Sequence, residues 1–82
     1  MSKKWGGSPV TKCNLCEQPM SHSVVKYKTI GGETRDFFVD GRTTIGGSWA
    51  LMCGVCHILF GRGFGVGLGQ AYDLETLEKI VG

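Results

Sequence analysis

Four cysteines are the residues of this chain whose type and spacing point most directly to chemistry. They form two Cys-x-x-Cys pairs, Cys13 with Cys16 and Cys53 with Cys56, and 36 residues separate the pairs. Two such pairs can converge on one ion, because a two-residue spacer makes a tight turn that directs both sulfurs to the same side. Gly54, inside the second pair, eases that turn. The spacing predicts one structural Zn²⁺ in a tetrahedral site of four thiolates.

Disulfide and redox uses of these cysteines fit the sequence less well. Disulfides are typical of exported chains. Residues 1–9 carry Lys3 and Lys4 but lack the apolar stretch of a signal peptide. A redox Cys-x-x-Cys needs only one pair and usually lies beside a βαβ pattern, which is missing here.

Haem attachment is a third alternative, because residues 53–57 match the Cys-x-x-Cys-His spacing. Met20 or Met52 would then supply the second axial ligand, and the first cysteine pair would have no role. His57 is interpreted as a surface or packing residue beside the second pair. The alternative is that it replaces a cysteine ligand or hydrogen-bonds a thiolate.

The sequence matches none of the catalytic motifs that its cysteines, histidines and glycines bring to mind. Four thiolates close the coordination sphere, whereas catalytic zinc keeps an open position. A zinc deaminase needs His-x-Glu and a proline before its Cys-x-x-Cys, but Ser23 and Val24 follow His22, and Met52 precedes Cys53. The glycine-rich residues 61–69 match neither a P-loop nor a dinucleotide fingerprint. The sequence therefore predicts a protein that is not an enzyme.

Length and composition predict one small domain that needs help to be stable. The chain has 82 residues, a mass of 8.9 kDa and 41% apolar residues, and a core of this size is marginal without a metal, disulfides or a partner. Its formal charge of +2 is cancelled when four thiolates and one Zn²⁺ contribute −2. The longest strongly apolar run, residues 49–53, is too short to span a bilayer. We expect a cytoplasmic protein with no membrane partner.

Between the cysteine pairs the pattern is that of β-structure. We expect a flexible basic arm over residues 1–12 and a single zinc-stabilised domain over 13–82. Residues 24–30 and 34–39 are rich in β-branched and aromatic side chains, which is typical of strands. Asp40-Gly41 is a hairpin turn signal before residues 42–45, so the interval predicts a hairpin or a three-stranded meander.

After Cys56 the pattern changes to short helical and glycine-rich segments. Residues 57–60 fit about one helical turn, which Gly61 ends. Glycine at every odd position of 61–69 predicts an extended strand with one bare face. A closing helix is expected over 73–81, with Asp73 as N-cap and Tyr72 stapled against Leu77.

Two surfaces are candidates for binding a macromolecule. The first is a basic sheet face that contacts nucleic acid, with the solvated face of an ordinary strand as the alternative; it comprises Lys26, Lys28, Arg35 and Arg42. The second is an exposed patch for a protein partner or for self-association, around Trp49, Phe64 and the glycine segment. Arg62, at the edge of that segment, is placed to contact a phosphate or a carboxylate.

Residues 40–56 and 65–72 resemble small zinc-finger proteins of bacteriophages, a family without an established biochemical activity. The resemblance covers roughly the second half of the chain and implies a phage origin and a place in the bacterial host cytoplasm. The order of knuckle, hairpin, knuckle and short helix is also similar to treble-clef zinc fingers, with a plain zinc ribbon as the alternative. The expected fold is a small α+β zinc-binding domain, treble-clef-like or zinc-ribbon-like, with a C-terminal helix. The expected function is nucleic-acid binding, or else an adaptor or inhibitor that docks on a host protein.

Overall fold

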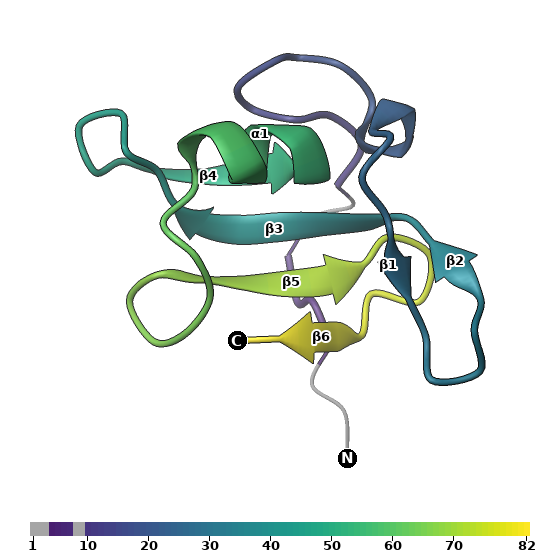
Figure 1. The fold of residues 1–82 in the computed structure, drawn as a ribbon. Coiled ribbons are helices and arrows are strands. Elements are labelled where there is room, and N and C mark those ends of the chain that lie inside the picture. The colour runs from purple at the N-terminus through teal and green to yellow at the C-terminus, as the bar shows by residue number, and fades with distance from the viewer. Residues whose placement is uncertain (1–3, 8–9) are drawn as a thin grey trace.

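A four-stranded antiparallel sheet is the centre of the molecule (Figure 1). The computed structural model describes residues 4–7 and 10–82. The strand order is β4-β3-β5-β6, and the strands are β3 (Phe37–Arg42), β4 (Trp49–Cys53), β5 (Gly69–Asp73) and β6 (Lys79–Val81). A separate antiparallel hairpin joins β1 (Tyr27–Lys28) to β2 (Thr34–Arg35). The helices α1 (Gly54–Phe60) and η1 (Met20–His22) both contact β3 and β4. A small α+β architecture is therefore confirmed.

Strand β3 lies between β4 and β5 and carries much of the core. Phe38 and Val39 are fully buried because both edges of β3 are paired and both of its faces are covered. Phe38 lies opposite Cys53 on β4 and opposite Tyr72 on β5. Three of the four cysteines belong to the same buried cluster as these residues. The sheet core and the cysteine site are one continuous unit.

The hairpin turn predicted at Asp40-Gly41 is wrong, because both residues lie inside β3. The chain reverses instead at Gly46 and Gly47, where φ is +65° and +73°, a conformation that glycine adopts without strain. Gly41 serves another purpose. A Cβ there would lie 3.0 Å from the Leu68 carbonyl oxygen, so glycine permits the close approach of β3 and β5.

The C-terminal helix predicted over 73–81 is also wrong. Asp73 does cap a turn, because its Oδ1 accepts hydrogen bonds from the backbone N–H groups of Glu75 and Thr76 at 2.8 and 2.9 Å. The turn ends at Leu77, where φ is +65°, and the chain returns as β6 along β5. Leu74, Leu77 and Ile80 are partly buried against the core in this arrangement too, whereas Val81 is exposed. Tertiary packing thus outweighed the local helix signal.

The glycine segment forms a loop and not the predicted extended strand. Positive φ values at Gly63, Gly65 and Gly67 coil residues 61–68, and the backbone N–H of Leu68 closes a turn onto the carbonyl of Gly65 at 3.1 Å. Strand β5 begins only at Gly69. The short helix predicted before this segment is confirmed, with Gly61 at its C-cap, but it begins earlier, at Gly54.

The N-terminal arm is attached to the sheet at Trp5. The Trp5 ring makes edge contacts with Phe38 and Tyr72 at a centroid distance of 5.4 Å in each case. Its backbone N–H donates to the Leu77 carbonyl at 2.8 Å. Within the segment expected to be a flexible arm, Trp5 therefore packs against the sheet. Residues 1–3 and 8–9 of that predicted arm, including Lys3, lie outside the described residues.

Candidate metal centre

The four cysteine sulfurs converge on one point of the structure. The Sγ atoms of Cys13, Cys16, Cys53 and Cys56 all lie within 4.8 Å of one another. Cys16 Sγ and Cys53 Sγ are 3.9 Å apart. In a tetrahedral site with zinc–sulfur bonds of about 2.3 Å, neighbouring sulfurs are about 3.8 Å apart. The cluster therefore has the size and the donor atoms that a tetrahedral thiolate site requires.

The first cysteine pair lies on a tight turn that is tied to β4. The Cys13 carbonyl accepts the backbone N–H of Glu17 at 3.0 Å, and Glu17 has a φ of +61°. Asn14 fixes the turn to the sheet, because its backbone N–H donates to the Leu51 carbonyl and its Oδ1 accepts the Leu51 N–H, both at 2.8 Å. Leu51 is two residues before Cys53. Asn14 thus sets the distance between the two pairs, a role that the sequence did not reveal.

The second cysteine pair spans the junction of β4 and α1. Cys53 ends β4 and is the N-cap of α1, and Cys56 lies in the first turn of that helix. Gly54 allows the helix to start here because a Cβ would lie 2.8 Å from Cβ of Val25 and 3.0 Å from the Phe37 ring. The sequence predicts that Gly54 eases a turn, and the structure shows that it also permits this close packing.

Burial and hydrogen bonding have opposite effects on the pKa of Cys13, whereas both raise the pKa of Cys56. Cys13, Cys53 and Cys56 are buried, and Cys16 is half-buried. Burial raises the pKa of Cys53 and of Cys56. Burial acts the same way on Cys13, but backbone hydrogen bonds from Cys16, Cys53 and Leu15 outweigh it and bring its pKa down to about 7. The Leu15 N–H lies 3.4 Å from Cys13 Sγ. Such N–H groups stabilise negative charge on sulfur, as a metal thiolate requires.

His57 lies beside the cluster but is not part of it. Among the described residues, the group of potential metal ligands contains only the four cysteines. The His57 ring packs on Phe64 with centroids 4.5 Å apart, and its Nε2 is 3.3 Å from the Gly63 carbonyl oxygen. The interpretation of His57 as a packing residue is confirmed. The haem alternative loses its basis, because both cysteine pairs face one another.

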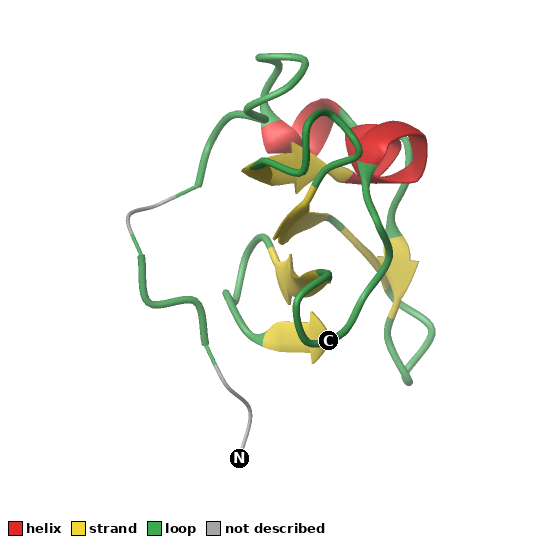
Figure 2. Ribbon diagram, turned by 90° about the vertical axis from the view of Figure 1, so that its left-hand side faces the viewer, coloured by secondary structure: helices red, strands yellow, loops and turns green. Residues whose placement is uncertain are grey.

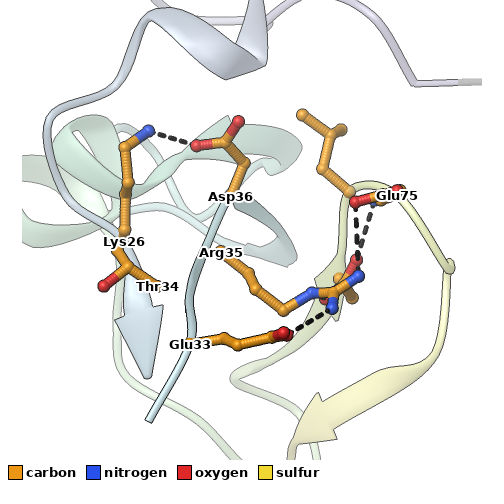
Figure 3. Close-up of a pocket in the computed structure, with 8 residues that line it drawn as sticks. Lys26, Glu33, Thr34, Arg35, Asp36 and Glu75 are labelled. Carbon is orange, nitrogen blue, oxygen red and sulfur yellow. Dashed lines mark hydrogen bonds and ion pairs between the residues drawn. The ribbon is translucent and has the colours of Figure 1, made fainter. Parts of the chain in front are cut away.

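Two of the predicted nucleic-acid residues are already engaged with carboxylates. Figure 3 shows Lys26 directed at Asp36, and Arg35 directed at Glu33 and Glu75, around an open groove. Arg35 also donates from Nε to Asp73 at 2.8 Å, and the Asp73 carboxylate raises the pKa of the guanidinium. The positive charge of these two side chains is therefore largely balanced within the protein.

Asp73 is the buried acceptor that joins the small hairpin to the main sheet. Its side chain is 3% exposed and accepts from the Tyr27 hydroxyl and from Arg35 on β1 and β2. Burial alone would raise the pKa of Asp73, but hydrogen bonds from Tyr27, Thr76 and Glu75 outweigh it and lower that pKa. Burial and the hydrogen bond to Asp73 raise the pKa of Tyr27 to about 12. The sequence pattern predicts Asp73 only as a helix N-cap.

The remaining predicted binding residues do not share one surface motif. The Arg42 guanidinium lies over the Trp49 ring, 6.0 Å from its centroid, and Trp49 Nε1 donates to Asp40 at 2.6 Å. Lys28 is exposed on β1, in the other sheet. Arg62 and Phe64 are exposed on the loop after α1. The structure therefore brings together Arg42 with Trp49, but not the whole basic set.

Within residues 4–7 and 10–82, no helix has the length and apolar character to cross a membrane. Comparison of the chain with protein-family models, with curated proteins and with solved structures finds no match.

Proposed function

We propose that this chain is a zinc-stabilised binding module, in which Cys13, Cys16, Cys53 and Cys56 hold one structural Zn²⁺. The convergence of four sulfurs within 4.8 Å carries the proposal. Soft thiolates in a tetrahedral arrangement favour zinc over the harder divalent cations. The ion is structural because four protein ligands leave no position for a substrate or a reactive water.

A treble-clef-like arrangement is the finer fold that we propose. In that arrangement the second ligand pair opens a helix, and here Cys53 is the N-cap of α1 while Cys56 lies in its first turn. A zinc ribbon would not require a helix at this position. The bacteriophage relationship and the cytoplasmic location stay predictions from the sequence.

The metal supplies folding free energy in this proposal. Three ligand cysteines belong to the buried core, and α1 starts from one of them. Structural zinc binding contributes on the order of 10 kcal/mol to small domains of this kind. Removing the ion would leave three buried cysteines and the half-buried Cys16 without the bonds that hold them together. The seven-residue helix α1 would lose its anchor, and a helix of that length is not stable alone.

Replacement of one ligand by two different residues tests the metal assignment. Cys16 is the most accessible of the four cysteines, so substitution there disturbs packing least. Cys16→Ser should lose zinc and far-UV circular dichroism structure, whereas Cys16→His should keep a weaker site because imidazole also ligates zinc. Zinc content by mass spectrometry under native conditions provides the measurement. Full structure in Cys16→Ser after chelator treatment would contradict the proposal.

A protein surface is the binding partner that the exposed side chains favour. Lys26 and Arg35 are engaged with carboxylates, which reduces the charge available for phosphates. Large apolar side chains are exposed on α1 and on the two loops beside it. Such a surface suits contact with another protein more than with a phosphate backbone.

Nucleic-acid binding is the second candidate, and one observation favours it. Trp49 is 46% exposed with Arg42 over its ring, and an aromatic paired with a cation can stack a base. Binding of a fluorescent single-stranded oligonucleotide at increasing salt tests this role. Steep weakening with salt, together with loss in Arg42→Gln, would support it. A flat salt response would exclude it.

A further inference from the structure

Exposed apolar side chains are concentrated at one end of the molecule. Of the ten exposed large apolar side chains among the described residues, seven lie within residues 45–68. Six of these belong to α1 or to the loops 43–48 and 61–68, and we call this set the apolar end: Ile45, Ile58, Leu59, Phe64, Val66 and Leu68. Val66 is 99% exposed, and Ile58 and Leu59 are 68% and 63% exposed. Side chains of this type at such exposure need an explanation beyond the fold.

The three segments of the apolar end adjoin one another. The backbone N–H of Thr44 donates to the Phe60 carbonyl at 2.7 Å, which ties loop 43–48 to the end of α1. The contact of Phe64 with His57 ties loop 61–68 to the same helix. Both loops project from one end of the main sheet, at the left in Figure 1 and towards the viewer in Figure 2. The apolar end is therefore one connected surface.

Charge is almost absent from this part of the chain. Residues 43–72 contain a single charged side chain, Arg62, whereas the other 15 of the 16 charged residues lie in 1–42 and 73–82. The centres of protein interfaces are depleted of Lys, Glu and Asp in the same way. One cation is too few for a surface that binds nucleic acid or anionic lipid, since both depend on clustered basic residues.

We infer that the apolar end is the interface of a homodimer, an inference that rests on the proposed protein-binding role and names a second copy of this chain as the partner. At about 150–200 Å² for each fully exposed side chain of this size, the exposed fractions of the six residues correspond to roughly 600 Å². The glycine backbone of loop 61–68 lies beside them and adds to this area. A standard interface buries about 800 Å² on each partner, so the six side chains alone supply about three quarters of that area and can form the apolar centre of a dimer interface.

Electrostatics favours a second copy as the occupant. Two juxtaposed apolar ends bring together only two like charges, one Arg62 from each chain. With four thiolates and one Zn²⁺ the formal charge of +2 becomes zero, so the two chains do not repel each other as wholes. Small domains also gain stability from association, because a core of this size is marginal.

The metal site and the interface share the helix α1. Cys53 and Cys56 fix the start of α1, and Ile58 and Leu59 lie in its remaining turn. The surface is therefore assembled only when the cysteine site is formed. We expect zinc-loaded chains to dimerise and chelator-treated chains to lose the dimer along with their structure.

Sedimentation equilibrium of the full zinc-loaded chain over micromolar to millimolar concentrations tests the inference. The wild-type mass should rise from 8.9 kDa towards twice that value. The double variant Ile58→Glu with Val66→Glu should weaken the dimer at least about 100-fold, because each glutamate would be buried without a partner. The matched control is Val24→Glu with Ile30→Glu. These residues are 85% and 109% exposed and lie outside the apolar end, so the control should dimerise like the wild type.

Three results would overturn the homodimer: a monomer at every concentration, an equally tight dimer in the double variant, or equal weakening in the control. Zinc content measured on the same samples separates this inference from the proposed function. A chain that holds one zinc and stays monomeric overturns only the dimer. A chain that folds and dimerises without metal instead overturns the zinc-stabilised module.

Discussion

Replacing Asp73 by alanine should destabilise the domain more than any exposed charge substitution. The Asp73 carboxylate is the shared acceptor between the β1–β2 hairpin and the main sheet. Its Oδ2 accepts from the Tyr27 hydroxyl and from Arg35 Nε, and its Oδ1 accepts from the backbone N–H groups of Glu75 and Thr76. Alanine would remove all four acceptor contacts at once, at a site with 3% side-chain exposure.

The magnitude follows from the four hydrogen bonds that the buried carboxylate accepts. A hydrogen bond to a charged group contributes about 1.5–3 kcal/mol, and the total is smaller than four such contributions because Tyr27, Arg35 and Thr76 are half-buried and Glu75 is exposed, so water replaces part of what they lose. We therefore expect Asp73→Ala to lower the free energy of unfolding by about 3–5 kcal/mol, a large share of the roughly 4–12 kcal/mol typical for a domain of this size. Asp73→Asn should cost less, about 1–2 kcal/mol, because its amide oxygen still accepts the two backbone N–H groups.

Urea unfolding of the zinc-loaded chain, followed by tryptophan fluorescence, measures these differences. Glu75→Ala is the matched control, since Glu75 also pairs with Arg35 but its side chain is 86% exposed. Removal of an exposed partner should change the free energy of unfolding by less than about 0.5 kcal/mol. A loss below about 1 kcal/mol in Asp73→Ala, or an equal loss in Glu75→Ala, would refute the role of the buried carboxylate as the attachment point.

Three further predictions concern the metal, the sheet and the arm. Lowering the pH from about 8 to about 6 should weaken zinc binding, because burial raises the pKa of Cys53 and Cys56 and each thiol must lose its proton to bind the metal. Competition with a chromophoric chelator measures the zinc affinity at each pH. An affinity that does not change with pH would argue against thiolate ligation. Gly41→Ala should lower the free energy of unfolding by about 1–3 kcal/mol, because its Cβ would lie 3.0 Å from the Leu68 carbonyl oxygen. The control Gly6→Ala, whose Cβ would have nothing within 4 Å, should leave the melting temperature unchanged. Trp5→Ala should lower the free energy of unfolding by about 2 kcal/mol, because the ring contacts with Phe38 and Tyr72 are lost. An unchanged melting temperature would mean that the N-terminal arm does not contribute to stability.

The cysteine cluster could be predicted from spacing alone, because two Cys-x-x-Cys pairs have few other uses in one small chain. The helix after Cys56 was predictable for a similar reason, since Gly61 is a local stop signal and α1 ends there. Asn14 was not predictable. Its two hydrogen bonds with Leu51 depend on a contact between residues 37 positions apart, which no local pattern encodes.

The errors in the fold share one physical cause. Asp40-Gly41 has the composition of a turn, and residues 73–81 have the cap and the apolar spacing of a helix, yet both segments pair in the main sheet. Local propensities differ by about 1 kcal/mol or less, and burial of neighbouring side chains outweighs them. The ion pairs of the predicted basic surface also depend on tertiary contacts, because the carboxylates that engage Arg35 come from β5 and from the turn after it as well as from its own hairpin.

Because β3 lies between two paired strands, the free energy of local opening should differ from strand to strand. Its ladders with β4 and β5 leave it without a free edge, so its amide hydrogens should exchange with solvent only when the whole domain unfolds. The two-residue strands β1 and β2 and the three-residue β6 should exchange through smaller, local openings. Because Cys53 is paired with Phe38 of β3, the metal site belongs to the slowest-exchanging cooperative unit. The ion would therefore be released at the rate of global unfolding, while the hairpin and the C-terminal strand open and close many times around it.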